Sequence, residues 1–286
     1  MIAKEKLTEL RHLAAKMRKD IILMVGVGQP GHVGGSCSSA DIVAVLYGHK
    51  MKHDPKNPKW EGRDKLLMSK GHAAIIQYAA LAELGYFPTE VLPTLKKLGS
   101  MLQGHPDIHK TPGIEANTGS LGQGLSISNG MALAMKLDKK PNKVYCILGD
   151  GELAEGQVWE AAMFAGAQKI DNLVVIIDQN CLQAMGRVAE RMNSNPLPEK
   201  WRAFGWHVLE IDGHNIEQII AALDAADTIK GKPTAIIAHT TKGKGFSFAE
   251  NVVGFHNGAM TQAQYDLGLK EADAVLAEFR PVETEA

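Results

Sequence analysis

A run of five consecutive apolar residues at 173–177, Leu-Val-Val-Ile-Ile, restricts the folds that this chain can adopt. A strand with apolar side chains on both faces is typical of a parallel sheet that helices cover on both sides. Similar β-rich runs occur at 144–148, 207–211 and 234–238. The segments between them have helical patterns, at 122–138, 152–169 and 215–230. This alternation predicts a doubly wound α/β fold with a mostly parallel sheet and helices on both faces.

The N-terminal segment predicts an amphipathic helix rather than an export signal. Apolar residues recur there at helical spacing, with Lys, Glu and Arg between them, at Leu7, Leu10, Leu13, Ala14, Met17 and Ile21. The apolar run 21–25 is too short to cross a bilayer, and no cleavage site of small residues follows it. The chain has three cysteines, an odd number without metal-ligand spacing, which favours a reducing compartment. We therefore expect a cytoplasmic protein.

Length and charge narrow the classes of function. The 286 residues contain no internal repeat and no obvious linker, so we expect a single domain over residues 1–280 and a solvated tail at 281–286. The formal net charge is −1, from 31 Lys and Arg against 32 Asp and Glu. A balance this close to neutrality gives no general electrostatic case for binding nucleic acid or an anionic membrane. Any anion-binding site must therefore be local.

Polar residues directly follow two of the predicted strands. The run at 144–148 ends in Gly-Asp-Gly-Glu, and the run at 173–177 ends in Asp-Gln-Asn. Asp150 and Asn180 are about one strand–helix–strand unit apart, so they should lie side by side at the carboxyl edge of the sheet. A carboxylate, an amide oxygen and a backbone carbonyl form an incomplete oxygen shell, which Mg²⁺ prefers when phosphate groups complete it. The alternative is that Gly-Asp-Gly is only a turn after a strand.

This pattern, Gly149-Asp150-Gly151-Glu152 followed by Asn180, resembles the cofactor motif of thiamine-diphosphate enzymes. The resemblance implies that Asp150, Asn180 and the backbone carbonyl of Leu182 hold Mg²⁺, and the same oxygens would accept Ca²⁺ or Mn²⁺. It also implies that Gly151 contacts the diphosphate of thiamine diphosphate. Many decarboxylases and dehydrogenase components share this motif, so the motif alone does not select one activity.

Further segments resemble motifs of the transketolase family and follow the family's order. They are 31–36 (Gly-His-Val-Gly-Gly-Ser), 63–73 (ending in Lys-Gly-His-Ala), 104–107 (Gly-His-Pro-Asp), 119–124 (Gly-Ser-Leu-Gly-Gln-Gly) and 256–258 (His-Asn-Gly). The resemblance covers residues 26 to about 260, and five ordered segments are highly specific for transketolase over its relatives. It implies the diphosphate-binding (PP) domain of the thiamine-diphosphate fold.

The resemblance also implies roles for four histidines. His32 and His105 are implied to contact the hydroxyl and carbonyl groups of a sugar substrate. His72 is implied to contact the diphosphate, and His256 to bridge cofactor and substrate. Imidazole suits such proton transfers because it donates and accepts near neutral pH. The chain has 11 histidines, and those that match no motif are expected to be structural: His12, His49, His53, His109, His207 and His214.

A glycine-rich loop and two acidic residues complete the expected site. Gly119, Ser120 and Leu121 precede the predicted helix 122–138, whose free N–H groups attract phosphate, and the resemblance implies contact with the cofactor. Glu155 and Glu160 match acidic positions that, in the family, join a carboxylate network linking paired active sites, and the resemblance places Glu155 among the cofactor-binding residues. The alternative for both is an ordinary solvated helix face. The sequence assigns no role to His239 or Lys244.

In the transketolase family the reaction moves a two-carbon ketol group from a ketose to an aldose, commonly as sugar phosphates of the pentose phosphate pathway. The glutamate that activates the aminopyrimidine ring, and the arginines that bind sugar phosphate, belong to domains that follow this segment in the family. We therefore expect one half of a split transketolase, active only with a separate C-terminal, pyrimidine-binding subunit in an α2β2 assembly. The segments 131–135 and 161–165 either serve that contact or are plain core.

Three departures from the family pattern leave the substrate open. Val33 replaces a motif proline, lysines and Met101 precede His105 where arginine is common, and residues 183–188 lack an Asp-Gly pair. These favour, as an alternative, a specialised ketose such as a sulfonated or branched sugar. The α component of a 2-oxo acid dehydrogenase shares the metal motif but not the spaced histidines. Deoxyxylulose-phosphate synthase is normally one long chain. A non-catalytic subunit would have no need to retain the metal residues and all the mapped histidines.

Overall fold

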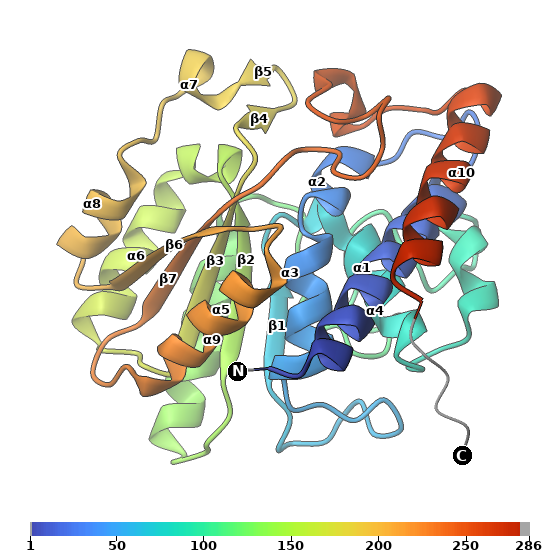
Figure 1. The fold of residues 1–286 in the computed structure, drawn as a ribbon. Coiled ribbons are helices and arrows are strands. Elements are labelled where there is room, and N and C mark those ends of the chain that lie inside the picture. The colour runs from blue at the N-terminus through green and yellow to red at the C-terminus, as the bar shows by residue number, and fades with distance from the viewer. Residues whose placement is uncertain (1, 281–286) are drawn as a thin grey trace.

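A five-stranded parallel sheet forms the centre of the molecule (Figure 1). The computed structural model describes residues 2–280, and the predicted tail at 281–286 lies outside the described residues. The order across the sheet is β1-β2-β3-β7-β6, and every neighbouring pair is parallel. The strands are β1 (Lys65–Met68), β2 (Val144–Gly149), β3 (Leu173–Gln179), β6 (His207–Asp212) and β7 (Thr234–His239). The predicted mostly parallel α/β sheet is confirmed.

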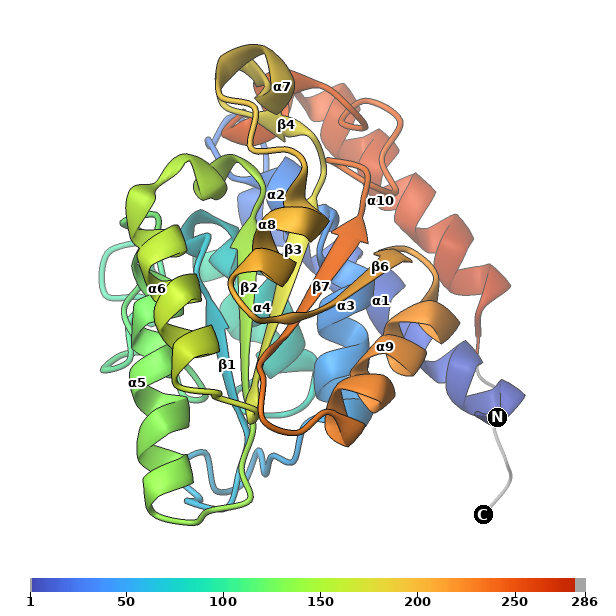
Figure 2. The same ribbon diagram turned by 90° about the vertical axis from the view of Figure 1, so that its left-hand side faces the viewer.

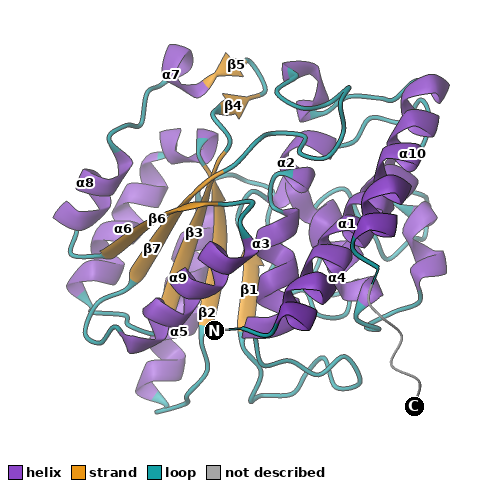
Figure 3. Ribbon diagram, in the orientation of Figure 1, coloured by secondary structure: helices purple, strands orange, loops and turns teal. Residues whose placement is uncertain are grey.

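Helices cover both faces of this sheet (Figures 2 and 3). One face carries α5 (Gln123–Leu137), α6 (Gly156–Ala167) and α8 (Leu197–Ala203). The other carries α1 (Lys4–Val25), α3 (Ala40–Val45), α4 (Ala74–Glu83) and α9 (Ile216–Thr228). The remaining α-helices are α2 (Val33–Cys37), α7 (Val188–Arg191) and α10 (Gln262–Glu278), which packs against α1. The shorter elements are the 3₁₀ turns Gly71–Ala73, Thr89–Thr94, Gly151–Ala154 and Val253–His256, the π turn Leu46–Lys50, and the small antiparallel pair β4 (Leu182–Gln183) and β5 (Gly186–Arg187).

Alternating side chains of the strands build two separate cores. On β2, Tyr145 and Ile147 pack with the α1, α3, α4 and α9 layer, whereas Val144, Cys146 and Leu148 pack with the α5, α6 and α8 layer. Successive residues of a strand point to opposite faces, so an apolar run is what a sheet buried on both faces requires. The apolar positions Leu10, Ala14, Met17 and Ile21 of α1 are likewise buried, as the sequence predicts.

The connections bring all carboxyl ends of the strands to one edge. The chain places β1, β2 and β3 next to one another in order, then forms β6 at the edge of the sheet and returns to place β7 between β3 and β6. The segments that follow the strands, at 69–72, 150–152, 180–182, 213–214 and 240–242, therefore meet along this edge, where ligands bind in open α/β sheets. All four predicted strands are confirmed within two residues. The predicted helix 152–169 begins only at Gly156, because residues 151–154 form a 3₁₀ turn.

Among the described residues, the structure has no helix with the length and apolar character needed to cross a bilayer.

Candidate functional site

Asp150 and Asn180 lie beside each other at the ends of β2 and β3, as their spacing predicts. The Asp150 carboxylate accepts hydrogen bonds from the N–H of Gly151, at 2.7 Å, and from the N–H of Cys181. Asn180 Oδ1 accepts the N–H of Leu182 at 3.1 Å. These contacts join the ends of the two strands into one polar surface that presents carboxylate, amide and carbonyl oxygens.

Asp178 is buried behind this surface and orients the residues on it. Its carboxylate is fully buried and accepts hydrogen bonds from Ser38 Oγ at 2.6 Å, from Asn180 Nδ2 at 3.1 Å, and from Lys70 and Thr240. Burial acts to raise the pKa of this carboxyl, but the Lys70 charge and the hydrogen bonds together lower it. Asp178 is therefore a stable anion from which the amide of Asn180 takes its orientation.

The three oxygen donors that the sequence proposes for a metal fit a hard cation. Burial, followed by the nearby charge of Asp178, raises the pKa of Asp150 to about 7 in the structure without an ion. The Asp150 oxygens, Asn180 Oδ1 and the Leu182 carbonyl each keep a lone pair beyond their present hydrogen bond. One contact was not predicted: Lys242 Nζ donates to the Leu182 carbonyl at 2.8 Å, so a protein cation already lies on one proposed metal ligand.

A cavity of about 140 Å³ opens at this edge of the sheet. It gathers seven of the residues that the sequence proposes: His72, Leu121, Asp150, Gly151, Asn180, Leu182 and His256. Residues that the sequence analysis did not assign also line it, among them Gly35, Lys70, Glu152, Gln183 and Lys242. The cavity therefore combines oxygen donors, two lysines and two histidines in one small space.

Four histidines from distant segments meet next to this cavity. The ring centroids of His32 and His72 are 5.0 Å apart, and those of His72 and His256 are also 5.0 Å apart. His32 lies 5.6 Å from His256 and 6.4 Å from His105. His105 and His32 are not among the residues that line the cavity, but they extend the same histidine cluster outward from it. The structure thus brings together all four histidines that the sequence selects.

Burial and neighbouring cations lower the pKa values of three of these histidines, His32, His72 and His256. The pKa of His32 falls to about 3, first through burial and then through the charges of His256, Lys96 and others. Burial and Lys70 lower the pKa of His72 to about 2, and burial and Lys242 lower that of His256 to about 4. These rings are therefore neutral imidazoles at neutral pH. Nδ1 of His32 is buried without a hydrogen-bond partner among the described residues.

Lys242 fixes the tautomer of His256. Lys242 Nζ lies 2.9 Å from His256 Nδ1, and an ammonium group can only donate, so Nδ1 accepts and Nε2 carries the ring proton. Burial and the charge of Lys70 lower the pKa of Lys242 to about 8. The sequence analysis missed both lysines. Lys70 lies within the quoted segment 63–73, two residues after β1, and Lys242 lies three residues after β7. These positions near the carboxyl ends of strands are the signal that could have found them.

The glycine-rich loop is held by a buried carboxylate. Glu152 Oε1 accepts the N–H of Gly122 at 2.9 Å and the hydroxyl of Ser69 at 2.5 Å, and Oε2 accepts the N–H of Gly149 at 3.1 Å. Burial raises the pKa of Glu152. One side chain therefore links the exits of β1 and β2 to the start of α5. The sequence analysis quoted Glu152 within its motif without giving it a function.

Glycine is required at position 119. Its φ is 143°, and a Cβ there would lie 2.8 Å from His105 Cδ2. The loop therefore packs its backbone directly against one of the clustered histidines. Ser120 follows it, is exposed and does not line the cavity.

The structure brings neither Glu155, directly before α6, nor Glu160, on α6, into the cavity. Glu155 is exposed beside the loop, where a Cβ added to Gly122 would lie 2.9 Å from Glu155 Cβ. Glu160 is exposed and lines a separate hollow on the outer faces of α5 and α6. His239, which ends β7, points to Glu210 at 3.6 Å. A direct cofactor contact of Glu155 therefore stays a prediction.

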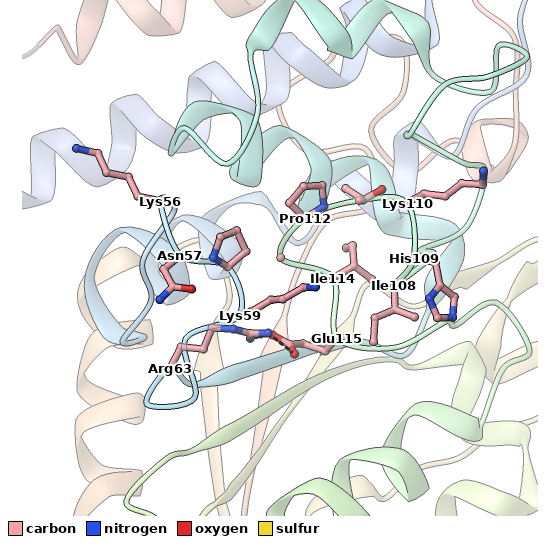
Figure 4. Close-up of a pocket in the computed structure, with 13 residues that line it drawn as sticks. Lys56, Asn57, Lys59, Arg63, Ile108, His109, Lys110, Pro112, Ile114 and Glu115 are labelled. Carbon is pink, nitrogen blue, oxygen red and sulfur yellow. Dashed lines mark hydrogen bonds and ion pairs between the residues drawn. The ribbon is translucent and has the colours of Figure 1, made fainter.

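A pocket of about 600 Å³ lies elsewhere, between residues 56–63 and 108–115 (Figure 4). Arg63 and Glu115 face each other in it and form an ion pair. Lys56 and Lys110 point away from its centre. None of the residues that line this pocket belongs to the predicted site, and its central charges already satisfy each other.

Comparisons with known proteins agree with this geometry. Residues 9–272 match the thiamine diphosphate binding domain of transketolase. The 6-deoxy-6-sulfo-D-fructose transketolase subunit of Clostridium sp. (strain MSTE9) is 47% identical over 269 residues, which cover 94% of this chain and 98% of that protein. An apulose-4-phosphate transketolase subunit of Phocaeicola vulgatus is 44% identical over 256 residues, which cover 90% and 91% of the two chains.

Solved transketolase structures also superimpose on this chain. The transketolase of Campylobacter jejuni superimposes with a TM-score of 0.82 at 32% identity, over 98% of this chain and 48% of that one. This chain therefore spans about half the length of that enzyme, and it covers 40% of Homo sapiens transketolase, with which it is 41% identical. On these matches, which extend over nearly the whole chain, the protein belongs to the transketolase family and corresponds to its thiamine-diphosphate-binding domain.

Proposed function

We propose that this chain is the N-terminal subunit of a thiamine-diphosphate-dependent transketolase, which transfers a two-carbon ketol group from a ketose to an aldose together with a separate C-terminal subunit. The observation that carries the proposal is the meeting of His32, His72, His105 and His256 beside the oxygen donors of the β2 and β3 edge. A diphosphate site needs such oxygens for its metal, and ketol transfer needs several neutral proton carriers near them.

The residues at this edge of the sheet would bind the metal and the diphosphate. Asp150, Asn180 and the Leu182 carbonyl would hold Mg²⁺, or Ca²⁺ or Mn²⁺, against a diphosphate that Gly151, His72 and the loop at 119–121 contact. Lys70 and Lys242 supply positive charge to the same cavity. When bound, thiamine diphosphate supplies the electron sink for breaking the carbon–carbon bond.

The histidines would handle protons on the sugar side. The ring proton of His256 is on Nε2, so that atom is a donor while Nδ1 is held by Lys242. Burial and neighbouring charges strongly lower the pKa of His32, so this ring would bind and orient sugar hydroxyl or carbonyl groups as a neutral imidazole. His105 lies at the outer end of the cluster, where it would contact the same substrate.

A partner subunit is part of the proposal. The full-length transketolases that match this chain are more than twice as long as it, whereas the relatives that match end to end are named as subunits. We infer that a C-terminal subunit with the pyrimidine-binding domain completes the site, in an α2β2 assembly. The exposed Met163 and Phe164 on α6 provide apolar surface for such a contact.

A specialised ketose is the second candidate substrate, in place of the sugar phosphates of the pentose phosphate pathway. The two end-to-end relatives described above carry names that specify 6-deoxy-6-sulfo-D-fructose and apulose 4-phosphate. Val33 directly follows His32, and Gln183 and Ala184 line the cavity. The departures at Val33, Met101 and residues 183–188 remove no proposed metal or diphosphate contact. They would therefore affect which sugar enters rather than whether the cofactor binds.

Reconstitution tests the proposal. The chain would be co-expressed with the product of the neighbouring gene and assayed with thiamine diphosphate and Mg²⁺, using xylulose 5-phosphate or 6-deoxy-6-sulfo-D-fructose as donor and ribose 5-phosphate as acceptor. We expect turnover that requires both chains, stops on chelation of the metal and is lost in Asp150→Ala. The surface variant Asp171→Ala is the matched control and should remain active. Robust turnover by this chain alone would contradict the split arrangement, and cofactor binding without turnover would point to other ketoses.

A further inference from the structure

His214 lies two residues after the end of β6 and makes a hydrogen bond with each of its ring nitrogens. Nδ1 lies 2.8 Å from Asp41 Oδ2, and Nε2 accepts the backbone N–H of Thr241 at 2.8 Å. The register of β6 and β7 pairs Asp212 with His239, and His214 and Thr241 each lie two residues beyond this pair. The sequence analysis expected His214 to be an ordinary structural residue, because it matches no motif.

The geometry determines which nitrogen carries the ring proton. A backbone amide can only donate, so Nε2 of His214 must accept and has no proton in this arrangement. The proton is therefore on Nδ1, which donates to the carboxylate of Asp41. Histidines that orient active-site groups are commonly held in one tautomer by such a carboxylate.

Asp41 is itself fixed as an anion. Arg18 donates to both of its oxygens, at 3.0 and 2.6 Å. Burial acts to raise the pKa of Asp41, but the Arg18 charge and the hydrogen bonds from His214 and Arg18 lower it to about 2. The carboxylate of Asp41 is therefore the acceptor for His214 Nδ1, and Nε2 of the neutral ring accepts from Thr241.

Thr241 lies between two residues of the site. Thr240 donates its hydroxyl to Asp178, and Lys242 donates to the Leu182 carbonyl and to His256. The N–H of Thr240 bonds to Gln179 O at 3.1 Å, at the end of the sheet. The bond to His214 holds the next N–H along the chain, that of Thr241, which directly precedes Lys242.

We propose that His214 is a positioning residue for the cofactor site. Backed by Asp41 and Arg18 on the helical layer, it holds the amide of Thr241 and thereby places Thr240 and Lys242 toward Asp178, Leu182 and His256. The consequence for cofactor binding rests on the function proposed above. The positioning itself does not, and it is measurable in the isolated chain.

Two substitutions of His214 distinguish a role in positioning Thr241 from a role in filling space. The amide of Gln reaches the position of Nε2, so His214→Gln keeps an acceptor for Thr241 while losing the geometry of the Asp41 bond. The amide of Asn reaches the position of Nδ1, so His214→Asn keeps a donor for Asp41 and loses the acceptor for Thr241. A side chain that acts only through Asp41 would tolerate Asn better than Gln, and positioning through Thr241 predicts the reverse.

Hydrogen exchange and nitrogen NMR on the isolated chain are the first measurements. In the wild type, ¹⁵N shifts of the His214 ring should identify Nδ1 as protonated and Nε2 as an acceptor. The Thr241 amide should exchange about tenfold faster in His214→Asn, as expected for loss of one hydrogen bond, and near the wild-type rate in His214→Gln. A proton on Nε2, or equal exchange in both variants, would overturn the assignment.

Cofactor binding by the complex with the C-terminal subunit is the second measurement. The complex would be titrated with thiamine diphosphate and Mg²⁺ in a calorimeter. Binding should be weaker in His214→Asn than in His214→Gln, with a Kd about 10–100-fold higher, as for other residues that orient metal ligands through hydrogen bonds. Melting temperatures of both variants control for folding. If the wild-type complex fails to bind the cofactor, the proposed function fails while the exchange result stands. If the wild type binds and the two variants bind alike, the inference about His214 is wrong.

Discussion

Asn180 Nδ2 donates a hydrogen bond of 3.1 Å to Asp178 Oδ2, two residues before it in the chain. This contact determines which end of the Asn180 amide is free, because it turns the NH₂ group inward to a buried anion. Oδ1 is thereby left on the cavity side, where it accepts the N–H of Leu182. The orientation that a metal ligand needs is therefore present in the protein before any ion binds.

Removing the anion should destabilise the fold strongly. Asp178→Asn leaves the ammonium of Lys70, which is 2% exposed, without its counter-charge in the interior. Breaking a buried ion pair from one side typically costs about 3–5 kcal/mol. We expect the free energy of unfolding, measured by urea denaturation of the chain, to fall by that amount.

A surface ion pair provides the control for this variant. Asp171 pairs with Lys136 at 3.0 Å in a more exposed position, so Asp171→Asn should cost less than about 1 kcal/mol. The double variant Lys70→Met with Asp178→Asn should recover part of the loss, because it no longer buries an unpaired charge. If Asp178→Asn and Asp171→Asn lowered the free energy of unfolding equally, the buried ion pair would contribute no more to stability than the surface pair.

Glycine at position 119 should be needed for the loop conformation. In Gly119→Ala the new Cβ would lie 2.8 Å from His105 Cδ2 at a φ of 143°, so either the loop or the histidine must move. We expect a loss of about 1–3 kcal/mol in the free energy of unfolding. Gly130→Ala in α5 is the matched control. Its Cβ meets open space, so it should be neutral or stabilise by about 0.5–1 kcal/mol in urea denaturation of the isolated chain.

The sequence predicts those parts of the structure that depend on short, local patterns of residues. The apolar run at 173–177 and the residues after it predict β3, its neighbours and the meeting of Asp150 with Asn180, because parallel strands end at a common edge. The short strand β1 was not predicted as a strand. It has only four residues and lies inside a segment that was noticed for its histidine.

The sequence analysis assigned no function to the residues that hold the site residues in place through hydrogen bonds. Asp178, Glu152 and His214 bind their partners across the sheet edge, and no spacing in the sequence indicates those contacts. The segments 131–135 and 161–165 were left as either core or contact surface. The structure divides them residue by residue, since Ala132 and Ala162 are buried whereas Met163 and Phe164 are exposed.

The stability of the chain should depend on pH through Asp20. Burial and the neighbouring carboxylate of Glu83 raise the pKa of Asp20 from 3.8 to about 7. The folded chain therefore binds a proton that the unfolded chain releases, and each pKa unit of difference is worth about 1.4 kcal/mol. The resulting stabilisation is complete below pH 3.8 and is lost as the pH rises through about 7.

Asp20→Asn tests this dependence. The variant cannot ionise, so it should be more stable than the wild type above about pH 7, and the difference should shrink toward about pH 4. Melting temperatures over this pH range measure it. The exposed Asp273→Asn on α10 serves as the control and should follow the wild-type pH curve. A constant offset between Asp20→Asn and wild type at every pH would rule out a titrating Asp20.

The outer face of α5 and α6 should bind the partner subunit. Phe164 and Met163 are 43% and 53% exposed there, next to Gly130, which leaves open space beside the helix. The two helices lie side by side on the face opposite to α1 and α9 (Figure 2), and Phe164 lines a hollow between them together with Leu133 and Gly130.

A charge on this face should prevent assembly without unfolding the chain. Phe164→Glu places a carboxylate where an interface would exclude water, so we expect the co-expressed complex to dissociate in size-exclusion chromatography with light scattering. Leu267→Glu on α10, with a similar exposure of 39%, is the matched control and should assemble normally. Melting temperatures of both isolated variants should stay near that of the wild type. If Phe164→Glu assembles as the wild type does, the partner binds elsewhere, and the exposed methionine and phenylalanine of α6 need another explanation.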